Sequence, residues 1–223
     1  MRLLMAICAA TMLPGGIGAA QETGMTRAEE TYDLLFRAGT LDDLPRDETL
    51  VYDRTVESAL MPDAEARDTG QIELTFEGDE PEAARLRFMQ DERFKAIGTF
   101  PASVGNPIIM YFVETVVRDM AETAGGSGFY IRNRVKAALF EPAEIEMREV
   151  AFGDETVEAR TVTLHPFEGD PNAARMQGFE RMALTVTMSE GVPGWYASLD
   201  ATVPAIDGES PIYSSTITLE PLE

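Results

Sequence analysis

The chain of 223 residues has one cysteine and one histidine, Cys8 and His165. Cys8 lies in an apolar N-terminal run that we expect to be removed, so the remaining chain cannot form disulfides or thiol-based sites. A zinc or copper centre would then depend mainly on carboxylates, which suit hard cations instead. We therefore expect no metal and no cofactor, and we expect His165 to be a partly exposed structural residue.

Motifs for catalysis or phosphate binding are also lacking. The run Gly125, Gly126, Ser127 and Gly128 fails as a nucleophile elbow because Phe129 stands where glycine is required and a helix, not a strand, precedes it. No Walker lysine accompanies these glycines. Carboxylates are too numerous to single out a catalytic pair. We therefore expect a protein without enzymatic activity.

Basic residues are scarce, with 18 Lys and Arg against 39 Asp and Glu and a formal net charge of −21. Such a surface repels phosphate backbones, so we expect no nucleic-acid partner. Lys95 and Lys136 are the only lysines. The acidic residues are spread along the chain. They indicate either a surface that favours solubility or a docking surface for a cationic protein of the cell envelope.

The N-terminus has the pattern of a secretory signal peptide over residues 1–20. Arg2 precedes an apolar run over residues 3–13, and small residues lead to Ala20. The run is shorter than the roughly 20 apolar residues that span a bilayer. We expect cleavage after Ala20, a periplasmic location, no membrane-spanning segment in the mature chain, and one domain over residues 21–223.

Period-two alternation of apolar residues predicts half-buried strands. A short helix should precede them, from about Arg27 to Ala38, because Thr26 and Glu29 form a capping box. Nine strands are predicted, over residues 49–58, 71–76, 84–89, 93–100, 144–152, 156–165, 179–188, 194–203 and 212–220. Arg54 interrupts the apolar face of the first one.

Two helices separate the fourth and fifth strands and form a hairpin insert over about residues 106–140. Asn106 is the predicted N-cap, and Pro107 fits the first turn. The second helix should run over residues 129–139. Together these elements predict an α+β fold with a large antiparallel sheet covered by the helical hairpin and the short N-terminal helix.

A short internal repeat links two parts of the sequence. Phe76, Glu77, Gly78 and Asp79 recur as residues 167–170, and each copy is followed by proline and an Ala-Ala-Arg run. We interpret the copies as repeated connections between strands, because neither has the dense alternating oxygen ligands of a calcium loop. A pair of carboxylate loops that hold Ca²⁺ is the alternative.

The predicted ligand site is the start of the first hairpin helix. Residues 108–113 are all apolar, so on a helix they face every direction and must be enclosed or line a cavity or contact surface. A basic cluster in the second helix could hold an anionic headgroup or pair with acids such as Glu114. The candidate site residues are Ile108, Ile109, Met110, Phe112, Val113, Val116, Met120, Tyr130 and Arg132.

The order of elements, with two helices inserted between two meanders, resembles the periplasmic lipoprotein-carrier superfamily of the Lol type. The resemblance covers most of the mature chain and implies a curved, incomplete barrel that is covered by helices and binds acyl chains. Our functional hypothesis is therefore non-catalytic binding or carriage of an apolar or lipid-like ligand between sheet and hairpin. The alternative is an interaction or scaffold protein of the cell envelope that acts through its acidic surface.

Overall fold

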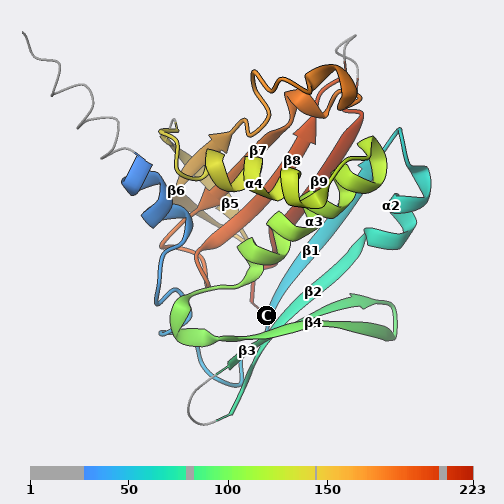
Figure 1. Ribbon diagram of the computed structural model, residues 1–223. Coiled ribbons are helices and arrows are strands. Elements are labelled where there is room, and N and C mark those ends of the chain that lie inside the picture. Colours follow the sequence, from blue (N-terminus) through green and yellow to red (C-terminus); the bar gives the residue numbers. More distant parts are fainter. Residues whose placement is uncertain (1–27, 79–82, 144, 206–209, 223) are drawn as a thin grey trace, which may run out of the picture.

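A computed structural model describes residues 28–78, 83–143, 145–205 and 210–222 of the chain. Its centre is one nine-stranded sheet in the order β4-β3-β2-β1-β9-β8-β7-β6-β5, in which every neighbouring pair is antiparallel. Figure 1 shows that the sheet twists strongly along this order, with β3 and β4 turned away from β7, β8 and β9. Since β4 and β5 are its two ends, the sheet is open. The predicted α+β class with a large antiparallel sheet is confirmed.

Each predicted strand overlaps an observed one. The strands are β1 (Leu50–Ser58), β2 (Gly70–Glu77), β3 (Ala83–Gln90), β4 (Arg93–Pro101), β5 (Ile145–Phe152), β6 (Glu155–Leu164), β7 (Ala183–Met188), β8 (Tyr196–Val203) and β9 (Tyr213–Leu219). In β1 and β9 buried and exposed side chains alternate, because successive side chains point to opposite faces of the sheet. This alternation accounts for the apolar residue at every second position of the sequence.

Two meanders meet in the middle of the sheet. β1 to β4 form one and β5 to β9 form the other, and the pairing of β1 with β9 joins them. In that pairing Tyr52 lies opposite Leu219 and Ser58 opposite Tyr213. The first and last strands of the chain therefore hold the sheet together.

Four stretches of α-helix lie among the described residues: residues 28–35, α2 (Pro62–Asp68), α3 (Ile108–Ala124) and α4 (Gly128–Ala138). Figure 1 shows α3 and α4 on one face of the sheet, with α2 beside β1 and β2. None of these helices combines the length and the apolar character needed to cross a bilayer. The predicted signal peptide lies outside the described residues.

Three local predictions were wrong or incomplete. Residues 179–181, predicted as part of a strand, form the short 3-10 helix η3 (Phe179–Arg181). β8 begins two residues later than predicted, because Gly194 and Trp195 have positive φ angles of 72° and 82°. The helix α2 was not predicted at all. Its sequence signals are Pro62 at the first turn and acidic residues beside it.

The internal repeat does not recur as structure. In the first copy Glu77 ends β2 and Ala83 begins β3, with residues 79–82 outside the described part. In the second copy a turn leads into the 3-10 helix η2 (Ala173–Arg175) instead of a strand. Both copies nevertheless belong to connections between consecutive strands, β2 to β3 and β6 to β7, as interpreted from the sequence.

Candidate functional site

Helix α3 separates two hollows of different character. Its buried side packs into the core, where Ile108, Phe112 and Val116 are at most 1 % exposed. Met110 and Val113 face a groove on one side of the helix, and Tyr111 faces a hollow on the other. The six apolar residues that open α3 are thus divided among the core, a groove and a hollow.

The groove, which we call the apolar groove, has a volume of about 530 Å³. It lies between the segment around residues 32–37, the connection from β4 to α3, and the hairpin of α3 and α4. The ring of Tyr32 stacks on Phe140 at 4.8 Å between centroids and lies 4.9 Å from Phe36, which joins the N-terminal helix to the end of α4. Its apolar walls include Tyr32, Phe36, Phe100, Pro101, Val104, Ile109, Met110, Val113, Leu139 and Phe140.

Exposed apolar side chains gather at this groove. Of nine large apolar side chains that are exposed among the described residues, four line it. They are Tyr32, Val104, Met110 and Phe140, with exposed fractions of 37, 68, 49 and 55 %. A contiguous exposed apolar surface of this kind is typical of a binding site, whereas single exposed apolar residues are ordinary.

Charged residues form the rim of the apolar groove. Arg132 donates two hydrogen bonds to Glu114, at 2.8 and 2.7 Å, and these bonds lower the pKa of the Glu114 carboxyl. This is one of the ion pairs expected from the sequence. Arg37 pairs with Glu190 at 2.9 Å. Lys136 has no ion pair with any described carboxylate, so its ammonium group is available to a ligand.

The predicted site residues fall in three places. Ile109, Met110, Val113 and Arg132 line the apolar groove. Ile108, Phe112, Val116 and Met120 belong to the core, where they are at most 2 % exposed. Tyr130 lies apart from both, with its hydroxyl 2.7 and 2.8 Å from the two carboxylate oxygens of Asp170.

Asp170 is the buried acid of the second repeat copy, and its contacts are structural. Burial acts to raise the pKa of its carboxyl, but hydrogen bonds from the Asn172 backbone and from Tyr130, with the charge of Arg134, lower it below its usual value. Arg134 Nε lies 3.0 Å from the carboxylate. These contacts fasten α4 to the loop that follows β6.

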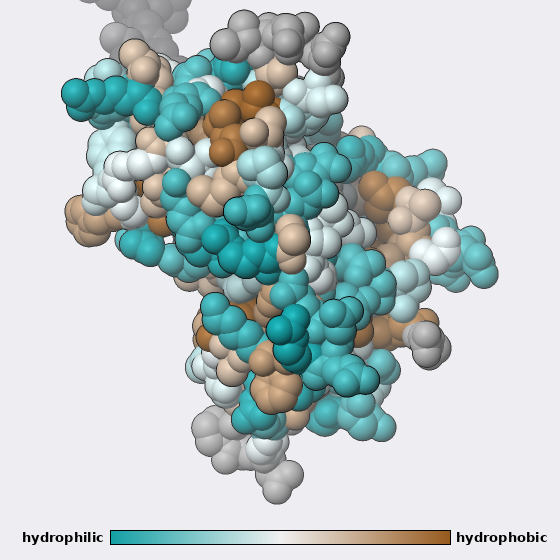
Figure 2. Space-filling model, turned by 90° about the vertical axis from the view of Figure 1, so that its right-hand side faces the viewer, coloured by the Kyte–Doolittle hydropathy of each residue, from teal (hydrophilic) through white to brown (hydrophobic). Residues whose placement is uncertain are grey.

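The second hollow, which we call the charged hollow, has a volume of about 650 Å³. It lies between α2, α3 and the strands β1, β3 and β4. Its walls comprise Arg54, Arg67, Asp68, Phe88, Gln90, Arg93, Phe94, Lys95, Ala96, Ile97, Tyr111, Arg118 and Glu122. The face that carries α2 and the β3–β4 hairpin is mainly hydrophilic, with apolar residues in separate patches (Figure 2).

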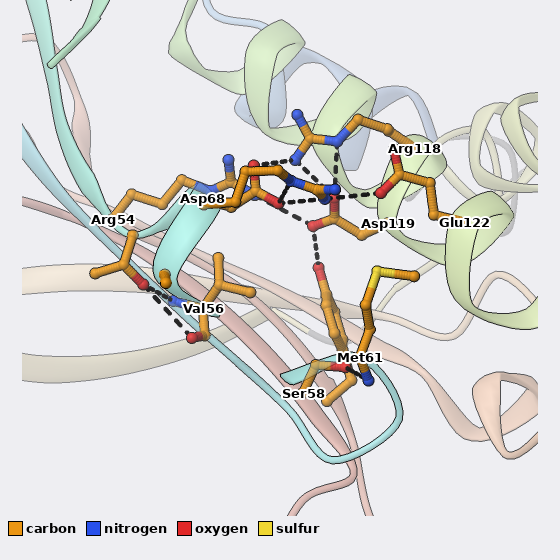
Figure 3. Close-up of polar contacts among 12 residues, drawn as sticks. Arg54, Val56, Ser58, Met61, Asp68, Arg118, Asp119 and Glu122 are labelled. Atoms are coloured by element: carbon orange, nitrogen blue, oxygen red, sulfur yellow. Dashed lines mark hydrogen bonds and ion pairs between the residues drawn. The ribbon is translucent and has the colours of Figure 1, made fainter. Parts of the chain in front are cut away.

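A network of ion pairs borders the charged hollow. Arg54 Nη2 lies 3.2 Å from Asp119, and its Nη1 donates to the Tyr111 hydroxyl at 3.2 Å. Arg118 donates two hydrogen bonds to the other oxygen of Asp119, and it also pairs with Asp68 at 3.1 Å. Figure 3 shows how Arg118 and Asp119 of α3 meet Arg54 of β1 and Asp68 of α2.

A third arginine, Arg67, extends this network to the surface. Arg67 pairs with both Asp68 and Glu122 at 2.7 Å, and these hydrogen bonds raise the pKa of its guanidinium. The network thus alternates cations with carboxylates from β1 through α3 to α2.

Among the described residues, no group of three or more His, Cys, Asp or Glu side chains is arranged to hold a metal ion. Comparison with models of protein families gives no match, and comparison with curated proteins gives none either. The geometry of the two hollows is therefore the basis for the function proposed below. The fold is of the class in which an open antiparallel sheet carries a helical hairpin. Here the hairpin forms one wall of each hollow.

Sequence analysis missed most of the groove and all of the charged hollow. The groove residues of the N-terminal helix carried a weak signal, since Tyr32 and Phe36 are four residues apart and share a helix face. The signal for the charged hollow was Arg54, a charged residue at a position that the alternation of β1 assigns to the buried face.

Proposed function

We propose that the protein is a non-catalytic binding protein that holds a single-chain amphiphile with an anionic headgroup in the apolar groove. The observation that carries the proposal is the gathering of four exposed apolar side chains along one groove of about 530 Å³. Volumes of this order suit small organic ligands, and apolar walls with a few polar groups are typical of their sites.

The rim of the groove supports the choice of an anionic headgroup. Lys136 is unpaired among the described residues and Arg132 pairs only with Glu114, whose side chain is half exposed. An unpaired cation beside an apolar surface can attract the anionic end of an amphiphile. An acyl chain would cover Met110 and Val113, while the carboxylate or phosphate would lie beside Lys136 and Arg132.

Carriage in the periplasm belongs to the same proposal. The N-terminal sequence is that of an exported protein. The resemblance of the sequence to Lol-type carriers, which bind acyl chains, supports carriage as part of the proposal. The groove differs from the site predicted from the sequence, because it lies between the hairpin and the N-terminal helix, on the side of α3 away from its core residues.

Binding of an anthroyloxy-labelled fatty acid, followed by fluorescence, tests the proposal. We expect saturable binding that the substitution Met110→Asp weakens by about tenfold or more, because a carboxylate would be placed against the acyl chain. Phe129→Asp is the matched control. Phe129 is 71 % exposed on α4 and lines neither hollow, so binding should be unchanged.

Native mass spectrometry of protein purified from its own periplasm should show a retained lipid. Absence of saturable fatty-acid binding, or equal binding by wild type and Met110→Asp, would overturn the proposal. Salt-sensitive capture of a cationic envelope protein in place of amphiphile binding would instead favour docking through the acidic surface.

A further inference from the structure

We propose that the charged hollow is a second binding site, for a small organic anion that carries a carboxylate or phosphate group on an apolar body. The inference does not depend on the proposed function, because the two hollows lie on opposite sides of α3 and have different walls. Two features of the charged hollow carry it: an excess of cations and aromatic walls.

The cations of the charged hollow exceed its carboxylates. The bordering network is balanced, since three arginines meet three carboxylates: Arg54, Arg67 and Arg118 with Asp68, Asp119 and Glu122. Arg93 and Lys95 of β4 remain, and neither makes an ion pair with a carboxylate of the described residues. Two uncompensated positive charges in so acidic a protein attract an anion.

The register of the strands places Arg54 and Arg93 on the same face of the sheet. Arg54 of β1 lies opposite Gly70 of β2, and Gln90 of β3 lies opposite Arg93 of β4. A Cβ on Gly70 would meet Gln90 Cγ at 3.1 Å, so the four residues form one row across the sheet. Three strand spacings separate Arg54 from Arg93, on the order of 14 Å between backbones, which leaves room for a small ligand between the wall at β1 and the cations of β4.

Arg54 helps to build the wall of the hollow. It is 1 % exposed, and its terminal nitrogens contact Asp119 and the Tyr111 hydroxyl, both on α3. These contacts hold α3 against β1 at one side of the hollow, and the exposed cations of β4 at the other side remain for an anion.

Aromatic residues form another part of the wall, and they favour an organic anion over an inorganic one. Phe88 of β3 and Tyr111 of α3 line the hollow, and Phe94 of β4 lies at its edge with its ring centroid 5.6 Å from the Arg87 guanidinium. Aromatic faces add little to the binding of a bare inorganic ion, but they stabilise an organic body that carries the charge. The volume of about 650 Å³ leaves room for such a body.

The two lysines of the chain allow each hollow to be followed separately, since Lys95 lines the charged hollow and Lys136 the apolar groove. Purified protein is acetylated with sulfo-NHS acetate, and mass spectrometry gives the rate at each lysine. We expect phenyl phosphate to slow acetylation of Lys95 by about fivefold or more and to leave Lys136 unaffected. A fatty acid bound in the apolar groove should instead slow acetylation of Lys136. The two proposals can therefore be tested, and can fail, separately.

Calorimetry with phenyl phosphate, benzoate and inorganic phosphate completes the test. The double variant Arg93→Ala/Lys95→Ala should bind phenyl phosphate about tenfold or more weakly. The control Arg160→Ala/Arg175→Ala removes two exposed cations that line neither the hollow nor the groove, and it should bind like wild type. Tighter binding of benzoate than of phenyl phosphate would assign a carboxylate, and the reverse a phosphate.

Three results would overturn the inference. They are the absence of saturable binding of either organic anion, undiminished binding by Arg93→Ala/Lys95→Ala, and binding of inorganic phosphate as tight as that of the organic anions. Both substituted residues are exposed and outside the ion-pair network, so loss of binding in this variant would not reflect loss of the fold.

Discussion

Arg54 is buried to 1 % exposure on the face of β1 that packs against α3. Its only carboxylate partner among the described residues is Asp119, which also accepts hydrogen bonds from Arg118 and from the Tyr213 hydroxyl at 2.7 Å. Removing a charge from water is costly unless an opposite charge and hydrogen bonds compensate for it. Asp119 is therefore the residue on which the burial of Arg54 depends.

Replacing Asp119 by alanine should lower the free energy of unfolding by about 3–5 kcal/mol, because the Arg54 charge would remain buried and unpaired. Urea denaturation of the variant and the wild type measures the difference. The double variant Arg54→Met/Asp119→Leu should recover part of the loss, since it removes both buried charges. A loss below about 1 kcal/mol in the single variant would show that Asp119 does not compensate for Arg54.

The sequence revealed Arg54 only as an interruption of an apolar face. Its partners could not be predicted, because Tyr111 and Asp119 belong to α3, 57 and 65 residues away. Such contacts depend on how α3 lies on the sheet, which a pattern within one segment does not contain. The grouping of Arg93 and Lys95 at the charged hollow could not be predicted for the same reason.

At the scale of elements, Asn106 fastens the start of α3 to the sheet. Its Nδ2 donates to the Tyr52 hydroxyl at 2.7 Å and to the Gly194 carbonyl at 2.8 Å, and its Oδ1 accepts from the Ile108 backbone at 3.1 Å. The sequence predicted the last of these roles, that of a cap, although α3 begins one residue later than the pattern suggested.

The substitution Asn106→Ala should lower the free energy of unfolding by about 2–4 kcal/mol, because it leaves a buried hydroxyl and a carbonyl without a donor and removes a cap. It should also increase hydrogen exchange in the first turn of α3 more than in α4. Chemical denaturation and exchange mass spectrometry measure the two effects. Uniform exchange across both helices would contradict a local anchoring role.

The elements themselves were more predictable than their packing. Nine strands followed from alternation, and both hairpin helices followed from their apolar faces and glycine ends. The helix α2 was missed because it has only seven residues and two buried side chains, too few to produce a helical period. A smaller part of the apolar groove was predicted, since α3 supplies one wall and distant segments supply the others.

At the scale of the whole molecule, three central strands each bury a tyrosine. Tyr52, Tyr196 and Tyr213 are at most 2 % exposed, and burial raises the pKa of each phenol above its ordinary value. Above pH 10 the unfolded chain releases protons that the folded chain keeps. Stability is therefore fully present below pH 10 and is lost as the pH rises beyond it.

We expect the free energy of unfolding to fall by up to about 4 kcal/mol per pH unit above pH 10, about 1.4 kcal/mol for each tyrosine. Urea denaturation at pH 8, 10 and 11, with phenolate absorbance followed at each pH, measures the loss. Equal stability at pH 8 and pH 11, or ionisation of all tyrosines in the folded protein, would contradict the prediction.

The pairing of β1 with β9 sets the order in which the molecule can fold. Each meander can form from neighbouring strands through short turns, but the contact between Tyr52 and Leu219 closes a loop that contains almost the whole described chain. Until the last strand is made, β1 and β8 keep unpaired edges, which are templates for aggregation. The sheet is therefore completed only after β9 has been made, and until then both of these edges stay open to pairing with other strands.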